Sequence, residues 1–206
     1  MKLSRSFLIE GLKKEISDIY ALFADEPIQI IELTDKIIEK AKAEGFQEKE
    51  THIVTKDIDW SFLSSQNENF DLFGSKKILE VKLIGSGPGN KGSKALKEYC
   101  LNPDPNKLLI VTAEGLEKKQ QGSAWSKALE ERGTLVIEPA INKLSMSKWI
   151  EDKAASMNLK IDKQALHLLC DKNEGNLNGA IQELMKLSLL FQNQEISIHD
   201  MQKSIS

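Results

Sequence analysis

Short apolar runs alternate with stretches of helical periodicity along the first two thirds of the chain. The runs have the length of strands, and they occupy residues 19–24, 51–55, 78–84, 108–112 and 134–137. Between several of them apolar residues recur at helical spacing, as in 28–44, 93–100 and 123–131. Apolar strands interleaved with helices are typical of a parallel sheet covered on both faces. The pattern therefore predicts an α/β fold with a five-stranded parallel sheet.

The chain after Pro139 has a different pattern. Helical periodicity runs from Leu144 to Phe191, in three apolar stripes: Trp149, Ile150, Ala154 and Met157; Ala165, Leu166 and Leu169; and Leu177, Ala180, Ile181, Leu184, Met185 and Leu187. Asp162 suits an N-cap, and Gly175 suits a helix end. The tail predicts one brief extended piece at 195–198 and no strong terminal element. We therefore expect two domains, an α/β domain at 1–140 and a small three-helix domain at 141–206.

Composition narrows the class of protein. A chain of 206 residues can bury a core without covalent staples. The two cysteines, Cys100 and Cys170, are far apart and the three histidines share no ligand spacing, so we predict no disulfide and no structural metal. The sequence has neither a signal-peptide pattern nor an apolar run of about 20 residues, and we expect a cytoplasmic protein that does not contact a membrane.

The charge balance argues against a surface devoted to nucleic acid. Lys and Arg total 28 and Asp and Glu total 31, which gives a net charge of -3. A DNA-binding module with a local basic patch is kept as an alternative. Its phosphate-contacting residues would be Lys91, Lys94 and Lys97, or Lys118, Lys119 and Lys127. Lysines at helical spacing more often form a solvated face.

The turn after the first strand is where an α/β nucleotide-binding module holds phosphates. Such a turn uses backbone N–H groups of a glycine-rich loop and a lysine. Here it reads Asp25-Glu26-Pro27, and its two carboxylates would repel a triphosphate. We interpret Asp25 and Glu26 as helix-capping residues, with Pro27 at the first helical position.

A second glycine-rich segment, Gly85 to Ser93, follows a later strand. Its register does not fit a phosphate-binding loop, because Asn90 stands where that motif needs glycine. We interpret it as a connecting loop. The strand before it ends in Leu83-Ile84-Gly85, without an acidic pair for magnesium. The sequence thus predicts no cofactor, and an AAA+-like nucleotide-binding protein with a site elsewhere is kept as an alternative.

The order of several short motifs makes the whole chain resemble a known family. These motifs are Tyr20-Ala21-Leu22-Phe23-Ala24-Asp25-Glu26-Pro27, Asp59-Trp60, Phe70-Asp71-Leu72-Phe73, Leu108-Leu109-Ile110-Val111, Ala124-Trp125 with Leu129, and Glu174-Gly175-Asn176-Leu177 leading into Leu184 to Leu190. In this order they resemble the delta subunit of the bacterial DNA polymerase III clamp loader, a degenerate member of the AAA+ superfamily.

The resemblance implies an AAA+ core, a three-helix lid and a helical collar domain, and we expect this chain to end before the collar. Its implied partners are the sliding clamp (beta subunit), the ATP-hydrolysing and delta-prime clamp-loader subunits through that missing collar, and primer-template DNA within the holoenzyme, a DNA-directed DNA polymerase. Asn176-Leu177-Asn178 lacks the lid arginine of active subunits, and Arg132 is not in a Ser-Arg-Cys setting. Both departures match the family's non-hydrolysing delta subunit, so no ATPase and no catalytic residue is expected.

The family's delta subunit grips the sliding clamp through a hydrophobic wedge. The matching residues are Asn69, Phe70, Asp71, Leu72 and Phe73. Adjacent leucine and phenylalanine side chains suit an apolar pocket, while Asn69 and Asp71 can hydrogen-bond at its rim. Alternatively, Leu72 and Phe73 belong to the core beside the next strand. The polar sequence Gly74-Ser75-Lys76-Lys77 that follows favours a surface turn.

Overall fold

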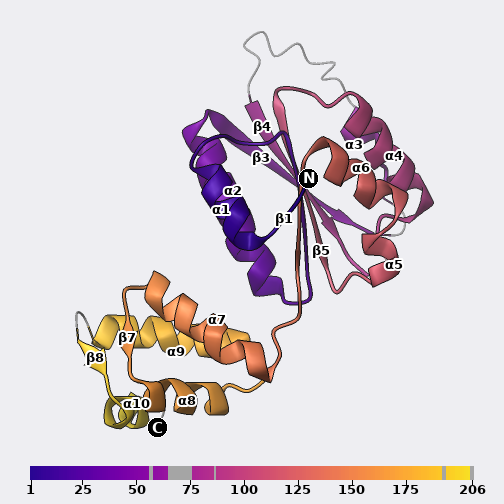
Figure 1. The fold of residues 1–206 in the computed structure, drawn as a ribbon. Coiled ribbons are helices and arrows are strands. Elements are labelled where there is room, and N and C mark those ends of the chain that lie inside the picture. The colour runs from indigo at the N-terminus through magenta and orange to yellow at the C-terminus, as the bar shows by residue number, and fades with distance from the viewer. Residues whose placement is uncertain (56–57, 65–75, 86, 192–193, 205–206) are drawn as a thin grey trace. The chain divides into compact units, whose positions relative to one another are not determined.

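A computed structural model describes residues 1–55, 58–64, 76–85, 87–191 and 194–204. The chain forms two compact units, Met1–Ala140 and Ile141–Ser206 (Figure 1). In the described part of the chain, no helix is both long enough and apolar enough to span a bilayer.

The first unit is built on a parallel sheet of six strands, in the order β1-β6-β2-β5-β4-β3. The strands are β1 (Lys2–Leu3), β2 (Ile19–Ala24), β3 (Phe46–Val54), β4 (Lys76–Leu83), β5 (Lys107–Glu114) and β6 (Thr134–Glu138). The predicted α/β fold and parallel sheet are confirmed, but the count of five strands is wrong. The missed strand, β1, has two residues, which is too short to produce a periodic signal.

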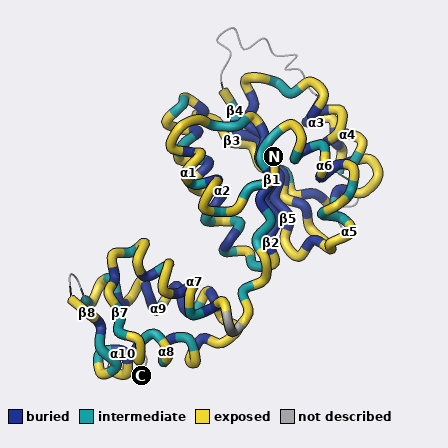
Figure 2. The backbone as a smooth tube through the Cα atoms, viewed as in Figure 1, coloured by how far each residue is buried: buried dark blue, intermediate teal, exposed yellow. Residues whose placement is uncertain are grey.

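Helices cover both faces of this sheet, as Figure 1 shows. On one face lie α1 (Arg5–Leu12) and α2 (Pro27–Ala43), and on the other α3 (Ser61–Ser64), α4 (Gly89–Leu101) and α6 (Ala124–Arg132); α5 (Lys118–Gln121) is a short turn before α6. Strand β2 is buried along its whole length (Figure 2). Its side chains alternate between the two cores: Ile19, Ala21 and Phe23 join one, and Tyr20 and Leu22 the other.

Helix α2 begins as expected at Pro27, which occupies its first position. The capping interpretation of the residues before it needs correction. Glu26 stands at the N-cap position, but its side chain makes no capping hydrogen bond. The carboxylate there can act on the helix only through its charge, an effect of about 0.3–1 kcal/mol at an exposed site.

A buried carboxylate lies in the middle of β4. Glu80 is 3% exposed, and its Oε2 accepts from Lys49 Nζ at 2.8 Å and from the Thr51 hydroxyl at 3.1 Å, both on the neighbouring strand β3. Lys82 Nζ lies 3.4 Å from its other oxygen. Burial alone would raise the pKa of Glu80, but the hydrogen bond and charge of Lys49, with help from Lys82 and Thr51, hold that pKa below its ordinary value. The ion pairs therefore stabilise the charged, folded form.

We expect Glu80→Gln to lower the free energy of unfolding at pH 7 by about 1–3 kcal/mol, because charge-assisted hydrogen bonds are lost at a buried site. A lowered folded-state pKa makes this contribution fully present above the unfolded pKa, about 4.3, and removes it as the pH falls through the folded value. Urea unfolding between pH 3 and 7 should thus show a difference from wild type that shrinks toward pH 3. The exposed Glu39→Gln change is the control. A difference that stays constant with pH would contradict the assigned role.

The second unit has more structure than the three helices predicted from its sequence. Within the described residues it contains four helices and a two-stranded parallel ribbon: α7 (Lys143–Ser156), β7 (Lys160–Ile161), α8 (Lys163–Lys172), α9 (Leu177–Leu190), β8 (Glu195–Ile196) and α10 (Ile198–Ser204). The tail predicted to lack a terminal element forms α10, whose Met201 is fully buried. Asp162 caps α8 as predicted, accepting from Ala165 N at 2.8 Å. Met185 does not join the core stripe, since it is 53% exposed.

Candidate functional site

The segment predicted to bind the clamp, Asn69 to Phe73, lies outside the described residues. Its described neighbours are the end of α3, at Ser64, and the start of β4, at Lys76. The choice between a surface wedge and a core position for Leu72 and Phe73 therefore stays a prediction.

Aromatic packing fixes the element that leads into this segment. Phe62 of α3 stacks on His52 of β3 with ring centroids 3.7 Å apart and planes at 5°, and Trp60 stacks on Phe62 at 5.7 Å. Trp60 is buried and packs against the first turns of α4, where an added Cβ on Gly92 would lie 2.2 Å from the indole. The backbone of α4 thus approaches the Trp60 ring as closely as glycine allows. Helix α3 is anchored on both sides, although it has only four residues.

The carboxyl edge of the central strands is acidic. Asp25 and Glu26 follow β2, while Glu114 ends β5 and Glu138 ends β6; both of these pair in register with Ala24. Four carboxylates thus gather where a nucleotide-binding module of this topology would hold phosphates. They give the edge a negative potential, which opposes binding of a triphosphate.

Arg5 of α1 partly neutralises the negative charge of this acidic edge. Its guanidinium pairs with Glu32 of α2 and lies 4.0 Å from Glu138. Burial raises the pKa of Glu138, Arg5 lowers it and Glu32 raises it again, for a net rise. The buried Gln29 amide lies 3.4 Å from Glu138 Oε2 and from the Pro139 carbonyl oxygen. These contacts connect α1, α2 and β6. We therefore assign Arg5 a structural role.

The glycine-rich segment that follows β4 leads into α4 earlier than predicted, because the helix begins at Gly89 rather than near Ser93. Gly85 and Gly87 have φ of 77° and 96°, values that favour glycine, as a connecting turn requires. No group of three or more metal-ligating side chains occurs among the residues that the structure describes.

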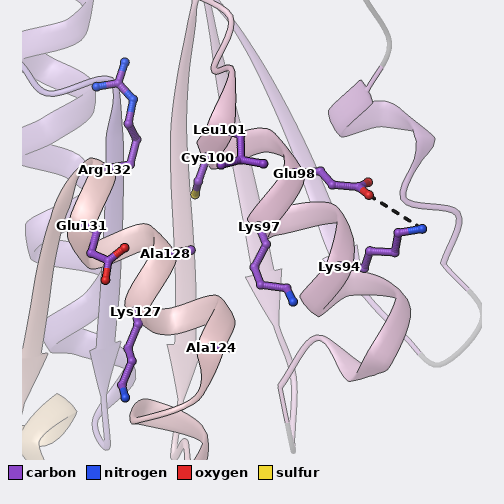
Figure 3. A pocket seen from close by; sticks show the side chains of 10 residues that line it. All are labelled: Lys94, Lys97, Glu98, Cys100, Leu101, Ala124, Lys127, Ala128, Glu131 and Arg132. Carbon is purple, nitrogen blue, oxygen red and sulfur yellow. Dashed lines mark ion pairs between the residues drawn. The ribbon is translucent and has the colours of Figure 1, made fainter.

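A groove of about 930 Å³ lies between α4 and α6, which pack side by side (Figure 3). It brings together three of the lysines considered for DNA binding: Lys94 and Lys97 from α4, and Lys127 from α6. Lys91, Lys118 and Lys119 do not line it. Ten residues form its walls: Lys94, Lys97, Glu98, Cys100, Leu101, Ala124, Lys127, Ala128, Glu131 and Arg132.

Sequence reasoning missed most of this groove. The spacing of the lysines identified some of the residues at its rim. The sequence pattern did not indicate that α4 packs against α6, because β5 separates the two helices in the sequence. Arg132, set aside as an arginine finger because it lacks a Ser-Arg-Cys setting, lies in the groove wall and reaches Asp18 at 3.5 Å. The Cys100 thiol is buried there, which raises its pKa to about 11 and leaves it a weak nucleophile.

The fold defines the class of protein: a parallel α/β core followed by a helical unit. This class is shared by the RuvB Holliday junction branch migration motor of Thermotoga maritima, whose structure superposes with a TM-score of 0.51 at 13% identity over 97% of this chain and 65% of that one. The DNA clamp loader delta protein of Bacillus subtilis is more similar, with a TM-score of 0.71 and 20% identity over 96% of this chain and 61% of that one.

Sequence comparison gives the particular family. The model of the family "DNA polymerase III, delta subunit" matches residues 20–138, more than half of the chain. DNA polymerase III subunit delta of Escherichia coli strain K12 is 29% identical over 202 residues, which are 98% of this chain and 58% of the relative. The chain belongs to the DNA polymerase III delta subunit family. It spans less than two thirds of the length of the curated relatives it matches.

Proposed function

We propose that this chain acts as a clamp-loader delta subunit, which binds the sliding clamp and helps to open the ring for loading on primed DNA in the cytoplasm. The clamp contact is assigned to Asn69, Phe70, Asp71, Leu72 and Phe73, with Leu72 and Phe73 as anchors. The observation that carries the proposal is that the family match, residues 20–138, encloses this segment with its paired apolar residues. Residues 141–206 are assigned to the lid.

We further propose that the chain does not hydrolyse ATP. The acidic carboxyl edge formed by Asp25, Glu26, Glu114 and Glu138 supports this, because it offers neither a glycine cradle nor a lysine to a triphosphate. ATP hydrolysis is assigned to the partner subunits, which with delta-prime would join this protein through a collar domain. Primer-template DNA is held within that complex.

The chain of 206 residues should bind the clamp without nucleotide, because its sequence includes the proposed wedge and the turn after β2 lacks the glycines and lysine of a phosphate-binding loop. Surface plasmon resonance with immobilised clamp, with and without ATP and magnesium, should give the same affinity within about twofold. In the complete loader, gating would come from neighbouring subunits that expose or mask the wedge. A strict requirement for ATP by the isolated chain would overturn the proposal.

The alternative of a nucleotide-binding protein is separated by direct ATP titration. Calorimetry of the same chain should detect no ATP binding in the micromolar range. A micromolar affinity would favour that alternative and would require a phosphate site away from the carboxyl edge.

A further inference from the structure

The groove between α4 and α6 has an apolar floor and a charged rim. Cys100 of α4 and Ala124 and Ala128 of α6 are the small side chains of its lining (Figure 3). Leu101, the last residue of α4, also lines the groove and is 86% exposed, a large apolar side chain presented to solvent. Small side chains on α6 and an exposed leucine on α4 leave room for apolar side chains of a partner.

The rim offers two cations that other described residues do not neutralise. Lys94 pairs with Glu98 at 3.7 Å, and Arg132 pairs with Asp18 at 3.5 Å. Lys97 and Lys127, one from each helix, are exposed and form no ion pair with another described residue. The whole chain is net negative, yet the groove's walls hold four cations and two carboxylates. Its charge is thus opposite in sign to that of the chain.

We propose that this groove binds an acidic amphipathic helix of a protein partner. Two helices side by side offer a third helix a channel, and the nine residues of α6 are about 13 Å long, enough for about two and a half turns. Apolar side chains at i, i+3 and i+4 would contact Leu101, Ala124 and Ala128. Acidic side chains flanking them would pair with Lys97 and Lys127.

Nucleic acid fits the groove less well. A phosphate backbone is recognised by a dense cationic surface, and contact with it gains little from an apolar floor. Here Glu98 and Glu131 interrupt the cations, so the walls do not form the continuous cationic track that follows a phosphate backbone. A helix that carries both apolar and acidic residues matches both features of the walls.

The test uses fluorescein-labelled synthetic peptides of 14 residues and the 206-residue chain at about 150 mM salt. A panel of acidic helical peptides carries leucines at i, i+3, i+4 and i+7 with flanking glutamates, in several registers. Two matched panels replace either every glutamate by lysine or every leucine by serine. Fluorescence anisotropy should detect binding of at least one acidic amphipathic register and weaker binding of both its matched forms.

Charge reversal then locates the site. Lys97→Glu with Lys127→Glu should weaken that peptide's binding at least about tenfold, since two ion pairs become two repulsions. The matched control, Lys36→Glu with Lys163→Glu, makes the same charge change on exposed residues elsewhere and should have little effect. Leu101→Ser should also weaken binding, and because this side chain is exposed, the melting temperature should stay unchanged.

Three results would overturn the proposal: no acidic peptide binds, the lysine-substituted panel binds as tightly, or the control reversal is as damaging as the groove reversal. Retention of duplex DNA at the same salt, abolished by the groove reversal, would instead identify a nucleic-acid surface. The groove shares no residue with the segment assigned to the clamp contact, Asn69 to Phe73. The groove variants should bind the clamp normally, so failure of either proposal can be told from failure of the other.

Discussion

Replacing Leu72 and Phe73 together by alanine is expected to weaken clamp binding at least about a hundredfold. Burial of each side chain in a pocket contributes about 1.5–3 kcal/mol, and central interface anchors commonly cost about 2 kcal/mol or more on truncation. The pair would remove about 3–5 kcal/mol, and each 1.4 kcal/mol is about tenfold in affinity. Surface plasmon resonance against the clamp measures this directly.

The same variant decides between a wedge and a core position. Anchors on the surface predict lost binding with an unchanged melting temperature, whereas two truncated core residues would lower folding stability by several kcal/mol. Leu189→Ala with Leu190→Ala is the matched control, because these adjacent leucines are 77% and 60% exposed. It should leave clamp affinity intact. Reduced stability of the Leu72 and Phe73 variant, with near-normal binding per folded molecule, would remove the main support for the clamp site.

Strand positions in the first unit were predictable because strands such as β2 are apolar at every position. Polar residues on either side of such a run mark where the strand begins and ends. β1 escaped prediction because a two-residue strand depends on its partner β6 and not on its own sequence. β3 began earlier than predicted, at Phe46, since the polar residues of an edge strand carry no apolar signal. Helix α10 was missed for a similar reason: it is short and is fixed by the burial of Met201.

The candidate site divides in the same way. The acidic residues Asp25 and Glu26 could be placed from sequence, because the turn after a first strand has a fixed position in this topology. Glu114 and Glu138 could not be added to them, since their closeness depends on strand order and register. The groove between α4 and α6 likewise requires knowing that two helices, separated in sequence by β5, pack on the same sheet face.

Close approach of Trp60 to α4 makes Gly92 a position where a larger side chain should be poorly tolerated. An added Cβ would lie 2.2 Å and 2.6 Å from two indole atoms and 2.7 Å from Pro88 Cβ, all well below contact distance. Gly92→Leu must therefore move the indole, and with it α3. We expect a loss of about 3 kcal/mol in the free energy of unfolding and a fall of roughly 10 °C in melting temperature.

The matched control is Gly11→Leu, because Gly11 lies inside helix α1 with no atom within 4 Å of an added Cβ. Leucine has the higher helix propensity, so this variant should be unchanged or more stable by up to about 1 kcal/mol. Comparing the two variants separates the effect of packing from that of helix propensity, because the substitution is the same and both sites are helical. Chemical denaturation monitored by tryptophan fluorescence measures the free energy of unfolding of both variants. Equal stability of the two variants would mean that the indole can move without cost, and that Trp60 does not fix α3 against α4.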